Sequence, residues 1–427
     1  MRERQTEVLV AGAGPVGLWS ALLLADAGLE VLIIDREERT ASRSYACALH
    51  PATLKRLQRF GLADEVIARG RRISKVGFYD GSERRAELDL AATDGDFPFL
   101  VILPQNVFES LLEQRLRQAG VKVLWNHNFA DCAQEDEMVA VTVEELAGTS
   151  TGYIVPHWEM VVKERAVVHA QFLLGADGHH STARQRLGLE SQHAGDRQHF
   201  AAYEFESDAG GEDEVRVVLD NATTNVLWPL PQNRYRWTFQ VVHSEPGAHF
   251  PEKDRRTARL AEPQIDERIR EYVQRVARHR APWFASAIKE ILWCSEVVFE
   301  RRMTTNFGRG RCWLAGDAAH QTGPVGVQSM NSGFAEGEML AGAVRKILRE
   351  QAPVEGLEAY NREYTDQWRQ LLGVTGGLTA RNATPPWVKE RSARLLPCLP
   401  GLSDDLATLA RQLGLECAGA PVAGKPG

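Results

Sequence analysis

Three glycines near the start of the chain have the spacing of a phosphate-binding turn. They occur as Gly12-x-Gly14-x-x-Gly17, between an apolar run and a segment rich in Ala and Leu. The first glycine allows a sharp turn, the second leaves room for a pyrophosphate, and the third lets helix and strand pack closely. N–H groups at the helix N-terminus can bind phosphate charge. A second apolar run ends at Asp35, a possible ribose ligand, so this order predicts a dinucleotide-binding unit.

Two later stretches place a carboxylate directly after an apolar run. The first is Gly175-Ala176-Asp177-Gly178, and the second is Gly316-Asp317, which follows Cys312-Trp313-Leu314-Ala315. A carboxylate at the end of a strand can accept a hydrogen bond from a ligand hydroxyl. The alternative is that each aspartate caps the helix that follows it. Behind Asp317 comes a loop with Gly323, Pro324 and Gly326, where backbone N–H groups can face an anionic ring.

Taken together, these stretches resemble the FAD-dependent aromatic hydroxylases, the class A flavoprotein monooxygenases typified by p-hydroxybenzoate hydroxylase. The matching motifs follow the family's order and cover most of residues 5–345. The resemblance implies FAD as cofactor, NADH or NADPH as co-substrate, and O₂. It also implies that an electron-rich aromatic small molecule is hydroxylated through a flavin C4a-hydroperoxide.

Specific residues can be assigned from this resemblance. The family has an arginine near its flavin ring at the place of Arg43, and it has a residue that reaches the ribityl chain at the place of Gln105. Asp317 is the expected partner of a ribityl hydroxyl. Arg43 and Pro324 are the expected catalytic residues. The expected cofactor-binding residues are Gly12, Gly14, Gly17, Asp35, Arg43, Gln105, Asp177, Asp317, Gly326 and Asn331.

The sequence also departs from the family pattern around the expected flavin loop. Gly323 stands at the first of two usual prolines, and Val327 and Ser329 replace glycines. Glu336-Gly337 stands where Asp-Ala is usual. The bulk of Val327 is expected to narrow or reshape the pocket above the flavin ring.

Composition limits the classes of partner. The 427 residues carry a net charge of −7, with 44% hydrophobic and 25% charged residues, as in ordinary globular proteins. We therefore expect no nucleic-acid partner, and no apolar segment suggests a membrane span. Six separated cysteines predict neither a metal site nor a disulfide framework, which favours a cytoplasmic protein. A homodimer is left open.

Hydrophobic periodicity predicts an α/β fold with C-terminal helices. We expect a Rossmann-like FAD-binding domain interleaved with a smaller, mainly antiparallel β-sheet substrate domain. The predicted parts are 1–70, 105–185 and 305–350 for the FAD-binding domain, 71–104 and 186–300 for the substrate domain, and 351–427 for the C-terminal helices. The substrate candidates are Tyr203, Trp228, Trp237 and His243, on or beside the sheet expected as the pocket floor.

Several interpretations compete with this one. His50 is expected to be a surface histidine rather than a catalytic one, and His320 is expected to have a packing role. A flavin-dependent halogenase usually shows Trp-x-Trp-x-Ile-Pro, whereas Arg236-Trp237-Thr238-Phe239 lacks the second Trp and the Ile-Pro. Lys75 would be the halogenase-type lysine. A flavin-binding protein with an altered redox site is the other alternative, supported only by Val327 and Ser329.

Overall fold

A mainly parallel sheet carries the glycine turn. In the computed structural model, β1 lies between β2 and β11, and the sheet order is β19-β20-β11-β1-β2-β8. The structure describes residues 4–40, 46–92, 95–151, 157–209, 213–242 and 263–418. The strands are β1 (Arg4–Ala11), β2 (Val31–Ile34), β8 (Val123–Leu124), β9 (His127–Gln134), β10 (Val139–Thr151), β11 (His157–Gly175), β19 (Gly308–Arg309) and β20 (Cys312–Leu314).

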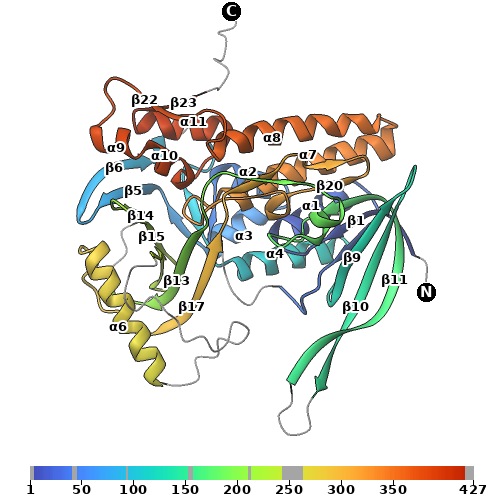
Figure 1. Ribbon diagram of the computed structural model, residues 1–427, viewed down its shortest axis with the longest axis horizontal. Coiled ribbons are helices and arrows are strands. Elements are labelled where there is room, and N and C mark those ends of the chain that lie inside the picture. The colour runs from blue at the N-terminus through green and yellow to red at the C-terminus, as the bar shows by residue number, and fades with distance from the viewer. Residues whose placement is uncertain are drawn as a thin grey trace, which may run out of the picture.

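A second sheet of seven strands lies beside the first (Figure 1). Its order is β17-β13-β16-β15-β14-β5-β6, and all neighbours except β14 and β5 are antiparallel. The strands are β5 (Lys75–Asp80), β6 (Glu83–Asp89), β13 (Gln198–Glu206), β14 (Glu214–Leu219), β15 (Thr224–Pro229), β16 (Arg234–Gln240) and β17 (Ile291–Phe299). Helix α6 (Pro263–Arg280) packs on one face of this sheet.

The longer helices surround the parallel sheet. Helix α1 is apolar on all sides because it is enclosed by the sheet, α4 and α7, and the indole N–H of Trp19 donates to Phe334 O at 3.0 Å. The helices are α1 (Pro15–Asp26), α2 (Pro51–Gln58), α3 (Leu62–Arg69), α4 (Gln105–Gln118), α5 (Thr182–Arg186), α7 (Gln328–Glu350), α8 (Glu358–Leu371), α9 (Pro386–Glu390), α10 (Ser392–Leu395) and α11 (Ser403–Gln412).

The remaining strands form three small sheets. They are β3 (Ala48–Leu49), β4 (Arg71–Ile73) and β7 (Leu100–Ile102), then β12 (Ser191–His193), β18 (Arg302–Thr304) and β21 (His320–Gln321), and finally β22 (Gly377–Ala380) with β23 (Leu415–Ala418). The predicted fold class is confirmed: a parallel sheet with helices, a mainly antiparallel second sheet, and C-terminal helices. The numerical domain boundaries remain predictions.

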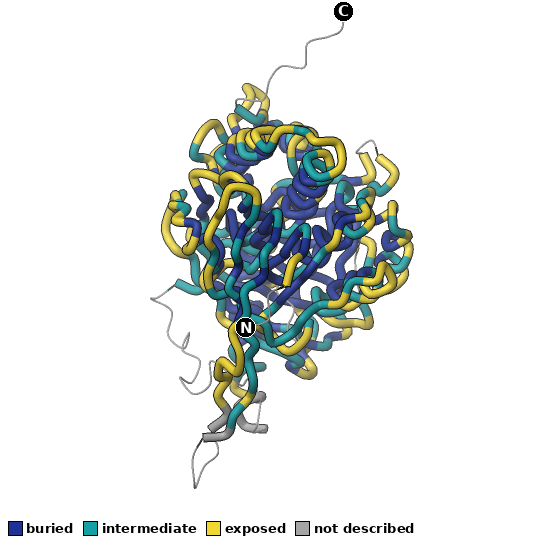
Figure 2. The backbone as a smooth tube through the Cα atoms, turned by 90° about the vertical axis from the view of Figure 1, so that its right-hand side faces the viewer, coloured by how far each residue is buried: buried dark blue, intermediate teal, exposed yellow. Residues whose placement is uncertain are grey.

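Buried residues form two hydrophobic clusters. The larger cluster runs through the parallel sheet and its helices, and the smaller one lies between the second sheet and α6. Figure 2 shows the buried chain gathered inside and the exposed chain around it. Within the described ranges, no helix is long and apolar enough to cross a bilayer.

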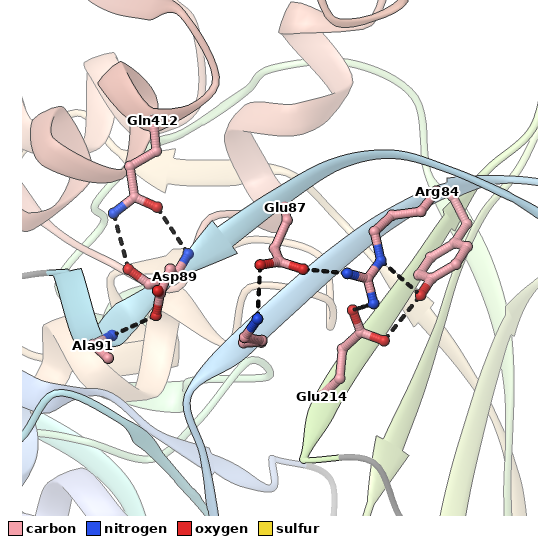
Figure 3. A network of polar contacts seen from close by, with 8 residues as sticks. Arg84, Glu87, Asp89, Ala91, Glu214 and Gln412 are labelled. Atoms are coloured by element: carbon pink, nitrogen blue, oxygen red, sulfur yellow. Dashed lines mark hydrogen bonds and ion pairs between the residues drawn. The ribbon is translucent and has the colours of Figure 1, made fainter.

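A polar network stabilises the far edge of the second sheet (Figure 3). The Glu214 side chain is only 3% exposed, and it bonds Tyr79 Oη at 2.9 Å, Arg84 Nη2 at 2.9 Å and Arg216 Nε at 2.8 Å. Burial raises the pKa of the Glu214 carboxyl, because it disfavours the charged form. The hydrogen bond from Tyr79 and the charge of Arg84 act in the opposite direction and favour the carboxylate. At the end of β6, Gln412 of α11 bonds the backbone of Asp89.

We predict that Glu214→Ala lowers the free energy of unfolding by about 3 kcal/mol, because it leaves two arginines at this edge without their shared carboxylate. Chemical denaturation measures the change. The control is Glu83→Ala on β6, where the side chain is 62% exposed. It should change stability by no more than about 0.5 kcal/mol. Equal effects of the two variants would contradict the structural role of Glu214.

Candidate functional site

A cleft of about 870 Å³ opens between the glycine turn, strand β17 and the loop before α7. It is partly enclosed, and its walls come from segments far apart in the sequence. Its lining residues are Gly14, Pro15, Val16, Ala46, Gln105, Ala176, Gly178, His179, His180, Arg184, Arg197, Glu296, Val297, Val298, Phe299, Glu300, Arg302, Ala315, Asp317, Gln321, Thr322, Gly323, Pro324, Val327, Ser329 and Met330.

The three glycines of the turn have different physical tasks. Gly12 has φ +104°, and a Cβ there would lie 2.2 Å from Ala176 O, while a Cβ at Gly17 would lie 1.9 Å from Gly12 O. These two glycines therefore allow close backbone packing. Gly14 faces the cleft, and a Cβ there would meet nothing within 4 Å. Gly14 leaves open the space at the N-terminus of α1 where a phosphate would lie.

Asp35 holds the same turn from the end of β2. Its Oδ2 accepts a hydrogen bond from Ala13 N at 2.6 Å, and its Oδ1 accepts one from Glu37 N at 2.8 Å. The side chain is outside the cleft lining. Each carboxylate oxygen keeps a second lone pair. The observed role of Asp35 is to hold the turn, and ribose binding by this residue remains a prediction.

Asp317 is one of the carboxylate residues that line the cleft, with Glu296 and Glu300. It lies in the short 3₁₀ helix η2 (Gly316–Ala318), whose N-cap is Ala315, so Asp317 is not the capping residue there. In the described part of the chain, no hydrogen bond to the Asp317 carboxylate is found. Burial raises the pKa of Asp317, and the charges of His320 and Arg302 offset only part of that effect. A ligand hydroxyl would supply the missing hydrogen bond.

Glu336 fixes the turn that carries Asp317. This side chain is fully buried in α7, and its Oε2 accepts from Gly316 N at 2.8 Å. Its Oε1 accepts from His320 Nε2 at 2.7 Å, Ser332 Oγ at 2.8 Å and Trp368 Nε1 at 3.0 Å. Burial alone would raise the pKa of Glu336, but His320 and these hydrogen bonds lower it, which favours the carboxylate.

The packing role expected for His320 is what the structure shows. The ring is fully buried and stacks on Trp368 with centroids 3.7 Å apart.

The change from Asp-Ala to Glu336-Gly337 has a steric explanation. A Cβ at Gly337 would lie 2.5 Å from Ser20 Oγ, so glycine lets α7 approach α1 at this point.

Asp177 lies beside the cleft and bonds the start of α5. Its Oδ1 accepts from Ser181 Oγ at 2.5 Å, and its Oδ2 accepts from Ala183 N at 2.9 Å. The next residues, Gly178, His179 and His180, line the cleft. The N-cap of α5 is Ser181, whose side chain accepts from Arg184 N, so Asp177 supports the cap without being the capping residue. Direct cofactor binding by Asp177 remains a prediction.

Two arginines form a cationic wall near these histidines. Arg184 Nη1 donates to Ala318 O at 2.8 Å, and both Arg184 and Arg302 donate to His179 O. Burial and the neighbouring Arg302 charge lower the pKa of Arg184 to about 10, so it remains positive at neutral pH. Both residues line the cleft together with Glu300, which pairs with Arg302 at 3.4 Å, so Arg184 is the arginine of the two without an ion pair within the described residues. Arg184 can attract an anionic ligand.

The loop before α7 contributes only part of its length to the cleft. Pro324 lines the cleft, but Gly326 and Asn331 do not. A Cβ at Gly326 would lie 2.5 Å from Pro397 O. Asn331 is buried and bonds the backbone of Ala48, His50 and Val327. These two residues hold the loop against the rest of the chain, and cofactor contact by either remains a prediction.

Val327 has a left-handed backbone conformation at the N-cap of α7. Its φ is 50° and its ψ is 39°, values that strain a β-branched residue. The side chain lines the cleft, and its carbonyl oxygen accepts from Asn331 Nδ2 at 2.7 Å. The glycine usual at this place would relieve the strain, so the valine is kept here at a cost in stability.

His50 is buried, so the expectation of a surface histidine was wrong. Its side chain is 2% exposed, and its Nε2 lies 2.8 Å from Gly326 O. Burial lowers the pKa of His50 to about 4, so the ring is neutral at pH 7 and donates from Nε2. This histidine connects the start of α2 to the loop before α7.

The other predicted site residues divide into three groups. Gln105 lines the cleft at the start of α4, and its Oε1 accepts from Ala46 N at 2.9 Å. Arg43 and His243 lie outside the described residues. Tyr203, Trp228 and Trp237 are buried and do not line the cleft.

The side chains of Tyr203 and Trp237 point away from the cleft. They lie opposite each other on β13 and β16, on the face that packs against α6. The strand that does line the cleft is the edge strand β17, through residues 296–299. Sequence reasoning missed this wall, although the adjacent apolar residues Val297, Val298 and Phe299 offered a signal.

In the described ranges, no group of three or more His, Cys, Asp or Glu side chains could hold a metal ion.

The chain matches the family model described as "FAD binding domain" over residues 5–374. It therefore belongs to this FAD-binding family. The cleft agrees with that membership, since Gly14 leaves space at a helix N-terminus and Asp317 presents a carboxylate without a described partner. FAD is the cofactor that this cleft fits.

Among curated relatives, 6-methylpretetramide 4-monooxygenase of Streptomyces rimosus is 32% identical over 89% of this chain, and the match spans 63% of the relative. Para-nitrophenol 4-monooxygenase of Pseudomonas sp. (strain WBC-3) is 26% identical over 90% of this chain and 87% of the relative. The solved structure of p-nitrophenol 4-monooxygenase PnpA from Pseudomonas putida DLL-E4 has the same fold, with a TM-score of 0.72 and 22% identity over 96% of this chain and 94% of that one.

We predict that Val327→Gly is more stable than Val327→Ala by about 1 kcal/mol, because only glycine adopts the left-handed conformation without strain. Chemical denaturation of both variants tests this order. Val344, a buried residue inside α7, is the matched control. There the alanine variant should be the more stable one by about 1 kcal/mol. The same order at both positions would exclude strain at Val327.

We predict that Glu336→Gln weakens FAD binding about tenfold, because the amide cannot accept from all four donors and the Gly316–Asp317 turn loosens. Flavin fluorescence titration measures the affinity. If Glu336 acts through Asp317, then adding Glu336→Gln to Asp317→Ala should cause little further loss. Glu338→Gln, at a surface ion pair of the same helix, is the control and should bind FAD normally. Additive losses in the double variant would contradict this coupling.

Proposed function

We propose that the protein is an NAD(P)H- and O₂-dependent FAD monooxygenase that hydroxylates an electron-rich aromatic small molecule. The carrying observation is the Asp317 carboxylate, without a described partner, in a cleft shared by the glycine turn and the loop before α7. The names of the relatives, all monooxygenases among those compared above, support the same reaction class. The balanced reaction converts aromatic C–H, O₂, NAD(P)H and H⁺ to C–OH, NAD(P)⁺ and water.

The chemistry that FAD would supply when bound is acceptance of a hydride from NAD(P)H and activation of O₂. The protein's contribution is to bind and orient. The helix N-terminus behind Gly14 would hold the pyrophosphate, and Asp317 would accept a hydrogen bond from a ribityl hydroxyl. Pro324 and Val327 lie in the loop that would face the flavin ring.

The cationic wall suits the approach of the nicotinamide cofactor. Arg184 and Arg302 lie beside His179 and His180, and all four residues line the cleft. An anionic dinucleotide would be attracted to this side. Another wall is formed by residues 296–299 of β17, where Val297 and Phe299 share one face of the strand and would contact an aromatic substrate. We propose this wall, rather than Tyr203, Trp228 or Trp237, as the substrate surface.

The observed contacts favour neither alternative function. Lys75 does not line the cleft and bonds Glu87 at 3.1 Å on the exposed edge of the second sheet, so no observation favours a halogenase. Strained Val327 affects the shape of the cleft and leaves the Asp317 carboxylate in place.

We also propose a cytoplasmic location, consistent with six cysteines that form no disulfide.

The enzyme proposal is tested with FAD-loaded protein and a panel of phenols, indoles and polyketide-like aromatics. We expect at least one compound to accelerate flavin reduction by NADH or NADPH and to be hydroxylated with O₂ uptake. Flavin absorbance, an oxygen electrode and product mass spectrometry report these three events. Asp317→Ala should weaken FAD binding about tenfold or more, because a hydrogen bond to a partly buried carboxylate is lost. Asp366→Ala, with a carboxylate that is 78% exposed, is the control. A protein that binds FAD but shows no NAD(P)H oxidation with any aromatic would reject the monooxygenase.

A further inference from the structure

A two-stranded ribbon projects from the parallel sheet. It consists of the end of β10 and the beginning of β11, which pair antiparallel from Leu146↔Val162 to Thr151↔His157, and a bulge at Lys163 separates this part from the pairing of residues 139–145 with residues 164–170. Figure 1 shows this pair extending well beyond the body of the molecule, and Figure 2 shows exposed and intermediate residues along the outer part whose burial is described. A two-stranded ribbon alone is only marginally stable in water. The outer part of this ribbon therefore lacks the packing that stabilises the rest of the sheet.

One edge of the ribbon is unpaired in the described chain. Strand β1 begins to pair with β11 only at Val168, on the side opposite to β10. Before that point, residues 159–165 are all exposed. Such an edge presents backbone N–H and C=O groups that can pair with another strand.

Three large apolar residues lie consecutively on this edge. Met160 is 47% exposed, Val161 is 40% exposed and Val162 is 44% exposed. Edge strands are normally protected by charge, proline or a covering element. Here the charges lie on either side of the apolar residues, at Glu159 and at Lys163, Glu164 and Arg165, and a bulge interrupts the strand at Lys163. The three apolar side chains between these charges are left exposed, and a covering strand would remove them from water.

The order of these residues specifies one self-complementary pairing. We propose that β11 pairs antiparallel with β11 of a second copy, with Val161 opposite Val161 of the partner subunit. One face then places Glu159 opposite Lys163 of the partner subunit, twice by symmetry. The other face places Met160 opposite Val162 of the partner subunit, also twice. Opposite residues of an antiparallel pair share a face, so charges meet opposite charges and apolar side chains meet apolar side chains.

Neighbouring registers lack this complementarity. A shift of one residue places Val161 opposite Val162 and brings Glu159 opposite Glu164. A shift of two residues places Val162 opposite itself, and it sets Val161 against Lys163 and Met160 against Glu164. The first shift brings two carboxylates together, and the second sets apolar side chains against charged ones. Both are unfavourable cross-strand pairs. A two-fold axis at Val161 is the arrangement in which all of residues 159–163 meet compatible partners, as a symmetric dimer interface requires.

The expected dimer is reversible. Pairing of one short strand buries less than the roughly 1,200 Å² of a standard stable interface. Analytical ultracentrifugation of the wild-type protein should show a monomer–dimer equilibrium that shifts to monomer on dilution. Sedimentation as a monomer at every concentration would overturn the proposal.

Point variants test the edge itself. Val161→Asp places two carboxylates opposite each other and should weaken dimerisation about tenfold or more. Val298→Asp is the matched control, because Val298 is 43% exposed on a different sheet, and its dimerisation should be unchanged. A dimer that tolerates Val161→Asp would show that the interface lies elsewhere and would overturn the proposal.

Charge reversal tests the register. Glu159→Lys and Lys163→Glu should each weaken the dimer, since each creates two like-charged pairs across the axis. The double variant Glu159→Lys/Lys163→Glu should recover part of the affinity. The recovery is expected to be partial because the introduced carboxylate would repel Glu145, which pairs with Lys163 within the wild-type chain. A double variant as weak as the single ones would reject this register.

Cross-linking gives an independent readout. Val161→Cys should form a disulfide-linked dimer under mild oxidation, because the two cysteines are directly opposite. Met160→Cys should not, because its own copy is displaced by two residues along the strand. Wild-type protein controls for the native cysteines. Equal cross-linking of the two variants would contradict the axis at Val161.

Discussion

The Glu336 carboxylate connects the cleft to the helices behind it. A fully buried carboxylate is costly unless it is well hydrogen-bonded, and this one accepts from Gly316, His320, Ser332 and Trp368. The contacts fix η2 to α7 and extend the connection to α8. The position of Asp317 therefore depends on residues that never reach the cleft.

The C-terminal segment adds a second constraint on the loop before α7. Gln328 Nε2 donates to Leu396 O at 3.2 Å and to Leu399 O at 3.1 Å. Within the same segment, Arg394 Nη1 donates to Asp220 O at 2.6 Å in the second sheet, and Trp387 Nε1 donates to Asp80 Oδ2 at 3.0 Å. The segment thus joins the loop to the sheet whose edge strand forms the other wall of the cleft.

Features that depend on a short stretch of sequence could be predicted from the sequence. The glycine turn could be predicted because its spacing acts within a short segment. The side chains of the second sheet could not be placed in the same way. Alternation separates two faces of a strand, but it does not say which face meets α6 and which meets the cleft. His50 was misjudged because its burial depends on Gly326 and Asn331, almost three hundred residues away.

The distribution of the cleft residues along the chain has a consequence for biosynthesis. Gly14, Gln105, Arg184, Val297, Asp317 and Pro324 must all be present before the cleft can close, and the hydrogen-bond partners of Gln328 extend to Leu399. During translation, an emerging chain would thus possess the glycine turn long before it possessed a complete flavin pocket. FAD binding then belongs to the last stage of folding, because free FAD would bind only those chains in which the distant segments are already in contact.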